Sequence, residues 1–186
     1  ITFTGPVTVN QGSATAVGTG AGAGDVTFGS TLALTSGGND DLTITAGTGA
    51  VTLTGAVTLN DNDLTIASSQ NSVITGGISG STGALDITDS GSTDVNGALA
   101  MSGAGTITLD GATLGADVTT VGGAINFSGA VTADQGSATA VGTGAGAGDV
   151  TFGSTLALTS GGSDDLTITA GTGAVTLTGA VTLNDN

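Results

Sequence analysis

A long internal repeat constrains this chain more than any other feature. Residues 125–186 reproduce residues 1–62 almost letter for letter, so the second copy begins 124 residues after the first. Across residues 11–62 the copies differ only at Asn39, which is replaced by Ser163 in the second copy. Such near-identity indicates recent duplication and predicts a long array of one structural unit.

A shorter period of about 25 residues recurs inside the long repeat. Each row offers three short strands, such as VTF, LAL and LTI, in which apolar residues alternate with Thr, and glycine-rich corners separate the strands. This alternation is typical of strands with one buried and one solvated face. We treat residues 1–186 as a single segment. Its rows are expected to start near residues 1, 26, 51, 73, 99, 125, 150 and 175.

Stacking the rows predicts an all-β fold, a parallel β-solenoid (β-helix) with about 25 residues and three short strands per coil. The crossover rule for parallel strands favours right-handed winding. In this register one internal column contains all four phenylalanines, Phe3, Phe28, Phe127 and Phe152. The row that starts at residue 73 breaks the inward alternation at Thr75 and Gly77, so we expect a bulge or an irregular loop there.

Two other interpretations of the pattern stay open. The strand-TG-strand segments resemble hairpins, which would produce an antiparallel meander, and the 36 glycines are also typical of disorder. However, hairpins do not explain a period of about 25 residues, and disorder does not explain 38% hydrophobic residues with only 8% charged residues. Small residues stacked on their own copies can form a stable array although aromatic residues make up only 2% of the chain.

The charge of the chain excludes several classes of function. There is no Lys, Arg or His, all 15 acids are Asp, and the net charge is −15. Phosphate backbones and anionic lipids would repel such a chain, and no apolar run approaches the ~20 residues that span a bilayer, so we expect neither nucleic-acid binding nor membrane insertion. The absence of Cys excludes disulfides and thiolate chemistry. We expect no enzymatic activity and no cofactor, with Ca²⁺ as the one candidate ion.

An acidic corner precedes the third strand of two adjacent rows. Residues 39–41 (Asn-Asp-Asp) come before Leu42, and residues 61–63 (Asp-Asn-Asp) come before Leu64, so the stack is expected to place Leu42 beneath Leu64 and one triplet over the other. Their oxygens are the ligands that Ca²⁺ prefers, and the alternative is a solvated acidic corner that salt screens. With the copies in the second repeat, the candidate calcium ligands are Asp40, Asp41, Asp61, Asp63, Asp164, Asp165 and Asp185.

Two further columns of polar residues follow from the expected register. The tenth position of each row is polar, and we expect its side chains to bond to turn amides and stabilise the corner. These residues are Asn10, Thr35, Asn60, Asp110, Asp134, Thr159 and Asn184. An outward column of hydroxyls, as ice binding would need, contains Thr2, Thr27, Thr52, Thr151 and Thr176. That column is interrupted at Ile74, Ala100 and Asn126, and Thr is favoured at exposed strand positions in any case.

The segments ITFTGPVTV, GDVTFGSTLALT and LTITAGTGAVTLTGAVTL resemble the repeats of filamentous-haemagglutinin-like bacterial surface proteins, which are giant exported β-strand-repeat adhesins. The resemblance implies a parallel β-helical shaft, export to the cell surface, and a role in adhesion, aggregation or biofilm. It carries over no functional residues. We therefore expect an extracellular structural rod or fibre that self-associates end to end or laterally and has an unidentified host, cell-surface or polysaccharide ligand. The alternative is a binding module for Ca²⁺ or ice.

Overall fold

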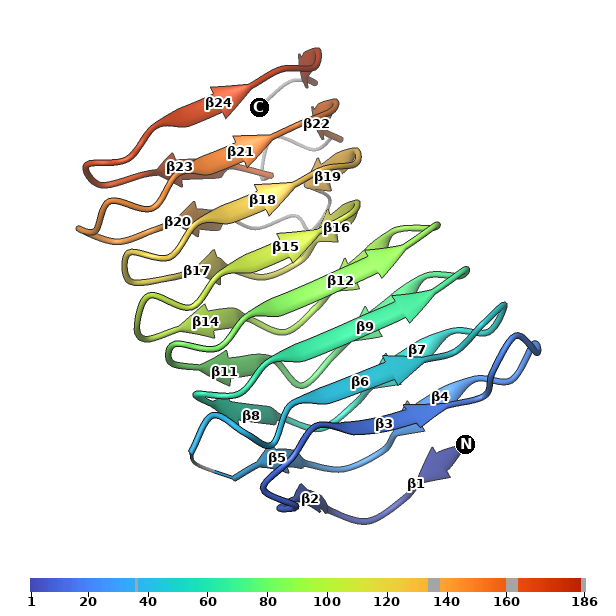
Figure 1. Cartoon of the computed structure of the whole chain (residues 1–186). Helices are drawn as coiled ribbons and strands as arrows, with labels where there is room; N and C mark the ends of the chain where they lie inside the picture. Colours follow the sequence, from blue (N-terminus) through green and yellow to red (C-terminus); the bar gives the residue numbers. More distant parts are fainter. Residues whose placement is uncertain (36, 134–137, 160–163, 185–186) are drawn as a thin grey trace.

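The structure, a computed structural model, describes residues 1–35, 37–133, 138–159 and 164–184. These residues form an all-β parallel solenoid of about eight coils, each with three short strands (Figure 1). Every strand pair is parallel, which rules out the antiparallel meander. Nowhere in the described ranges is there a helix long and apolar enough to cross a membrane.

Three sheets, here called A, B and C, run along the solenoid and form its faces. Sheet A contains β1 (Thr2–Phe3), β4 (Val26–Phe28), β7 (Val51–Leu53), β10 (Ser72–Ile74), β13 (Thr93–Val95), β16 (Ala112–Leu114), β19 (Val131–Ala133), β22 (Leu156–Leu158) and β25 (Val181–Leu183). Sheet B contains β2 (Val7–Val9), β5 (Leu32–Leu34), β8 (Val57–Asn60), β11 (Ile78–Gly80), β14 (Leu99–Met101), β17 (Val118–Thr119), β20 (Thr139–Gly142) and β23 (Leu166–Thr169). Sheet C contains β3 (Thr15–Gly18), β6 (Leu42–Thr45), β9 (Leu64–Ser68), β12 (Leu85–Asp89), β15 (Ile107–Leu109), β18 (Ile125–Phe127), β21 (Val150–Phe152) and β24 (Val175–Leu177).

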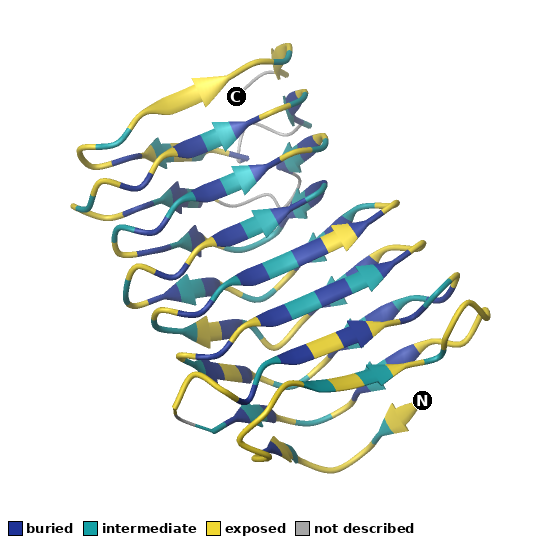
Figure 2. Cartoon of the chain, in the orientation of Figure 1, coloured by how far each residue is buried: buried dark blue, intermediate teal, exposed yellow. Residues whose placement is uncertain are grey.

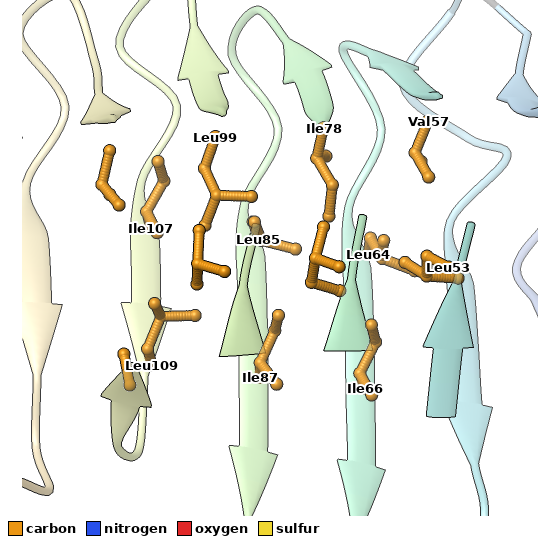
Figure 3. Packing of buried hydrophobic residues seen from close by; sticks show 14 of the residues in the cluster. Leu53, Val57, Leu64, Ile66, Ile78, Leu85, Ile87, Leu99, Ile107 and Leu109 are labelled. Carbon is orange, nitrogen blue, oxygen red and sulfur yellow. The ribbon is translucent and has the colours of Figure 1, made fainter. Parts of the chain in front are cut away.

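The core is a continuous stack of aliphatic side chains between the three sheets. Alternate residues of each strand point inward, and those of the middle coils are almost completely buried (Figure 2). Figure 3 shows this packing across several coils, in which Leu64 and Ile66 lie beside Leu85 and Ile87 of the next coil. Burying such a side chain contributes about 1.5–3 kcal/mol. Each coil therefore depends on the coils above and below it for stability.

Two pairings on which the predicted register depended are confirmed. Phe3 pairs with Phe28, and their rings stack with centroids 4.7 Å apart. Leu42 pairs with Leu64 in the adjacent coil, as expected. The single phenylalanine column, however, is wrong. Phe127 and Phe152 stack on each other at 4.8 Å in sheet C, whereas the first pair lies in sheet A.

The predicted coil length holds only near the two ends of the chain, and the middle coils are shorter. From Val26 in β4 to Val181 in β25 the chain completes seven coils, so the average coil contains about 22 residues. Two predicted rows, residues 73–98 and 99–124, each contain or overlap four strands instead of three. The predicted starts at 99, 125, 150 and 175 therefore fall in sheets B, C, C and C rather than in sheet A.

This slip rotates the second copy of the long repeat relative to the first. β4 and β21 have the same sequence, VTF, but β4 lies in sheet A and β21 in sheet C. They stand 17 strands apart in chain order (21 minus 4), which is five and two-thirds coils. Equivalent residues of the two copies thus lie on different faces, while the sheets continue without a break.

An irregularity occurs where the fourth row pairs with the third, but the bulge is in β8 of the third row and not at Thr75 and Gly77, where it was expected. Ser79 pairs with Thr58 but Gly80 pairs with Asn60, so Leu59 is the extra residue. Asn60 has φ of 54°, the one positive value at a non-glycine residue in the described chain, and Asn tolerates this left-handed conformation. A Cβ at Gly80 would lie 2.6 Å from the sulfur of buried Met101, so the Met101 side chain would have to shift.

Candidate functional site

The acidic corner lies between sheets B and C, where the two triplets stack as predicted. Their backbone amides bond to the side chains of the neighbouring triplet. The Asp63 amide donates to Asp41 Oδ1 at 2.9 Å, and the Asp40 amide donates to Asn62 Oδ1 at 2.8 Å. The triplets are therefore joined by hydrogen bonds between coils, and their oxygens do not converge on a common centre.

Asp40 is the most enclosed acid of this corner, and its carboxylate is fully occupied. One oxygen accepts hydrogen bonds from the amides of Gln11 at 2.8 Å and Gly12 at 2.6 Å, and the other accepts one from the Thr35 hydroxyl. The Thr35 bond, followed by the two amides, lowers the pKa of Asp40 below its ordinary value, although burial opposes this shift. Asp40 thus connects the first coil to the second.

Asn62 closes the corner from inside. Its side chain is completely buried, and its amide nitrogen donates to the Leu59 carbonyl at 2.9 Å and to the Thr35 carbonyl. Its oxygen accepts the Asp40 amide. Both polar atoms of this side chain are therefore used to stabilise the turn.

The candidate calcium ligands are not gathered into one site. In the described part of the chain, no three acids are grouped so that they could hold a metal ion. Asp61 accepts the Thr82 hydroxyl at 3.2 Å, and Asp63 accepts the Ala84 amide at 2.7 Å. Calcium binding therefore stays a prediction without support from the geometry.

The copies of these acids lie at a different corner. Asp164 and Asp165 lie between β22 and β23, at the corner of sheets A and B, because the second copy is rotated. Asp164 is buried, and one of its oxygens lies 3.4 Å from the donating Thr159 hydroxyl. Asp185 lies outside the described residues. The seven predicted ligands thus belong to separate parts of the molecule.

A recurrent use of aspartate was missed by the sequence analysis. An Asp directly before a strand accepts the amide of the equivalent residue in the next coil, at 2.7–2.9 Å. The pairs are Asp25 with Ala50, Asp41 with Asp63, Asp63 with Ala84, Asp117 with Ala140, and Asp149 with Ala174. Asn71 accepts the Ser92 amide in the same way, at 3.1 Å.

These bonds explain the positions of five of the 15 acids. Four of the five amides lie just before a strand, beyond the end of the regular ladder, whereas Ala140 is the second residue of β20. In each pair a carboxylate in the earlier coil satisfies the donor. The sequence signal is Asp followed by Val or Leu, as in GDV, NDL and ADV. In every pair the acceptor belongs to the earlier coil, so the series has one direction along the solenoid.

A second missed feature is a buried carboxylate at the corner of sheets C and A. Asp89 Oδ1 accepts the hydroxyls of Ser68 at 2.8 Å and Ser72 at 3.1 Å. Its other oxygen accepts the Ser72 amide at 3.0 Å and the Thr93 hydroxyl at 3.2 Å. All four residues are buried, and no buried polar atom of the described side chains lacks a partner. The signal was a set of polar residues at inward positions of the strand pattern.

The two predicted polar columns are divided between faces. Asn10, Thr35 and Asn60 stay together beside sheet B, where the Thr35 hydroxyl donates to Asn10 Oδ1 at 3.2 Å. Asp110 follows a strand of sheet C, Thr159 and Asn184 follow strands of sheet A, and Asp134 lies outside the described residues. The single threonine column is also wrong.

Threonines do pair locally, but on two faces. Thr2, Thr27 and Thr52 stack in sheet A, whereas Thr151 and Thr176 stack in sheet C. Val73 and Asp94 follow Thr52 in the sheet A column, so the hydroxyl array ends after three coils. An extended flat hydroxyl surface of the kind that ice binding needs is therefore not formed by these residues.

The outer face of sheet B contains a shallow groove of ≈ 440 Å³. Its floor consists of short side chains, among them Ser79, Gly80 and Ala100, and Val121 at its rim is 58% exposed. No acid lines the groove. It therefore lacks the titratable groups that hydrolytic or proton-transfer chemistry uses.

Three comparisons with known proteins give no match: no protein-family model, no curated protein and no solved structure matches this chain. The parallel β-solenoid is compatible with β-helix repeat adhesins. The resemblance to filamentous-haemagglutinin-like proteins therefore rests on the repeat sequence and on this compatibility of fold.

Proposed function

We propose that this chain is part of an extracellular structural rod, such as the shaft of a cell-surface adhesin or filament. One observation carries the proposal: two nearly identical copies of a 62-residue segment continue the same three sheets although they lie on different faces. A fold that accepts the same module in two different positions around its axis can be lengthened by duplication. Length is the property that a shaft requires.

The stacking geometry supports this role quantitatively. Each coil adds one strand to each sheet, and adjacent strands lie ~4.8 Å apart. The 124-residue period spans five and two-thirds coils, so each period lengthens the rod by about 27 Å at constant cross-section. Nearest-neighbour stacking makes stability grow with the number of coils.

The surface chemistry supports a passive rather than a catalytic role. Five of the acids named above accept a hydrogen bond from an amide of the next coil, so charges that favour solubility also connect the coils. The chain has no Lys, Arg, His, Glu or Cys. The absence of Cys fits an extracellular location, because the fold does not depend on the redox state of its surroundings.

The proposal is tested by measuring rod length against the number of modules. Chains with one, two and three copies of the 124-residue period are imaged by electron microscopy and measured by small-angle X-ray scattering. Length should rise by about 27 Å per added period with an unchanged diameter. The control is a chain of equal composition whose added period has inward and outward strand residues exchanged. Lengths that do not increase, or particles that widen, would contradict the proposal.

A further inference from the structure

The asparagines of this chain are chemically labile residues. An asparagine loses its side-chain amide when the backbone nitrogen of the next residue attacks Cγ and closes a succinimide ring, and the displaced NH₂ leaves as ammonia with the proton of that nitrogen. Water then opens the ring to aspartate or isoaspartate, so the net change replaces NH₂ by OH. Nine asparagines occur in the sequence, and the structure describes the residue that follows seven of them. They are Asn10, Asn39, Asn60, Asn62, Asn71, Asn96 and Asn126.

The sequence alone would place this deamidation at Asn96. The next residue is Gly97, which has no side chain to hinder attack by its nitrogen and leaves the backbone free to rotate. Asn96 is also exposed, at the corner between β13 and β14. The equivalent corners after β7 and β10 have Thr54 and Thr75 at this position. In an unfolded chain Asn96 should therefore react first.

The fold holds the attacking nitrogen of this pair away from the side chain. The Gly97 amide donates to the Ile74 carbonyl of the preceding coil at 3.0 Å. Ring closure requires rotation of the Asn96–Gly97 peptide toward Cγ, and that rotation would break the bond. The backbone is also tightly enclosed here, since a Cβ at Gly97 would lie 2.2 Å from the Gly77 nitrogen. The most reactive pair in the sequence is thus fixed in an unreactive geometry.

Four further asparagines have the same protection, from acceptors at least 17 residues away in the chain. In each case the amide that follows the asparagine donates to a side-chain oxygen at 2.8–3.0 Å, and three of the four acceptors are carboxylates. The bonds are Gln11 to Asp40 (after Asn10), Asp40 to Asn62 (after Asn39), Asp63 to Asp41 (after Asn62), and Ser72 to Asp89 (after Asn71). Phe127, which follows Asn126, lies within β18 between two paired strands.

Asn60 is the exception within the described ranges. It lies at the bulge in β8 and has a φ of 54°. The amide of Asp61, which follows it, has no hydrogen-bond acceptor among the described residues. Asn60 therefore provides an internal reference for an asparagine that shares the fold but not the protecting bond.

We propose that the hydrogen bonds of the corners protect the asparagines of this chain from deamidation, and that Asp40, Asp41 and Asp89 are the protecting carboxylates at three of them. Reaction then requires a local opening that frees the amide, so its rate falls in proportion to the open fraction. Protection allows a corner to use both polar atoms of an asparagine without losing the side chain over time. This inference goes beyond the proposed function, since it concerns the folded corners whether or not they belong to a shaft.

The test measures deamidation of the full chain, folded and in urea, by mass spectrometry of peptic peptides after incubation at the same pH and temperature. The ratio of the rate in urea to the rate in the folded chain cancels the intrinsic effect of the following residue at each asparagine. The ratio should be at least about 100 at Asn71 and Asn96 and smallest at Asn60. Native-state hydrogen exchange of the following amides should rank the sites in the same order.

Asp40→Ala isolates the contribution of one carboxylate. The Gln11 amide loses its acceptor, so the folded-state rate at Asn10 should rise about tenfold, as expected for loss of a hydrogen bond to a charged group. Asp25→Ala is the matched control. It removes the same charge and the acceptor of the Ala50 amide, but Ala50 follows a glycine, so no asparagine should react faster.

Three results would overturn the inference. The first is an Asn96 that reacts as fast in the folded chain as in urea. The second is an Asn60 protected as strongly as Asn96, which would assign the protection to the rigidity of the fold alone. The third is a rate at Asn10 that Asp40→Ala leaves unchanged or lowers, since a lower rate would make the carboxylate a base that assists the attack. If Asp40→Ala also exposes Asn71, the variant has unfolded, and the order of the ratios in the unmodified chain decides.

Discussion

Asp89 shows how a charge can be buried in a protein that has no cationic side chain. Its two oxygens accept four hydrogen bonds from three residues, Ser68, Ser72 and Thr93, all of them enclosed. Hydrogen bonds to a charged group are stronger than those between neutral groups. The residue therefore holds four strands of three successive coils together without an ion pair.

Replacement of Asp89 should accordingly be costly. We expect Asp89→Ala to lower the free energy of unfolding by about 3 kcal/mol, because it leaves buried hydroxyls and an amide without their acceptor. The measurement is urea denaturation followed by circular dichroism. Asp86→Ala is the control, since Asp86 lies on the same strand but faces outward, and its effect should stay within about 0.5 kcal/mol. Equal losses for both variants would contradict a role of the buried cluster.

Asp40 should make part of the stability depend on pH. Its folded-state pKa lies below the value of about 3.9 expected in an unfolded chain, mainly because of the Thr35 hydrogen bond. The unfolded state then binds protons first as the pH falls. The contribution of Asp40 is present above about pH 3.9 and is lost as the pH falls through the lower folded-state pKa.

Comparison with Asp40→Asn isolates this contribution from the general effect of reducing a net charge of −15. Thermal unfolding at a series of pH values should show a stability difference that is constant between about pH 5 and pH 8 and shrinks in stronger acid. A difference that stays constant down to about pH 2 would show that the carboxylate charge is not involved.

Strands and corners obey different constraints. A strand needs alternate apolar residues, so most triplets such as VTF and LAL could be recognised and their local pairing predicted, as for Phe3 with Phe28 and Leu42 with Leu64. The number of residues in a corner varies widely, from seven between β3 and β4 to two between β15 and β16. The alternation of apolar and polar residues contains no information about corner length. The predicted number of residues per coil is therefore too large in the middle of the chain.

Two of the strands that escaped prediction have inward residues that are not strongly apolar. β13 begins with the buried Thr93 and β16 with the buried Ala112, so the hydrophobic pattern is weak there. The candidate site, the acidic corner, could likewise be predicted only in part. The stacking of the acidic triplets followed from the strand register, but their partners did not, because the direction of an unpaired amide is set by the three-dimensional turn.

Close contact between corners produces a glycine column where sheets B and C meet. Each of its members would place a Cβ within 2.4 Å of a carbonyl oxygen in the coil below. They are Gly83, Gly105, Gly123, Gly148 and Gly173. Here the backbone of one coil lies directly on the backbone of the next, and only glycine leaves enough space.

We expect Gly123→Ala to destabilise the protein by about 2–3 kcal/mol, because its Cβ would lie 1.9 Å from the Gly105 oxygen and the backbone must move. Gly5→Ala is the matched control, since nothing lies within 4 Å of its added Cβ and its φ is not positive. It should be neutral or stabilising by about 0.5 kcal/mol. Urea midpoints of the two variants provide the test, and similar midpoints would contradict close packing at this corner.

At the scale of the molecule, the aspartate bonds and the sheets impose a common direction. Every Asp before a strand in the pairs named above accepts an amide from the following coil, and every strand pair is parallel. The solenoid therefore has a chemical direction along its axis, which each added period continues.

The offset of one face between copies also determines how an extended array would present itself to its surroundings. Three faces do not divide the 17 strands of a period evenly, so an identical side chain returns to its original azimuth only after three periods, about 80 Å further along the axis. Any motif carried by the module is therefore arranged helically around the long axis of the solenoid. Neighbours approaching from any side would meet it equally often, but a flat substrate could engage only one copy in three.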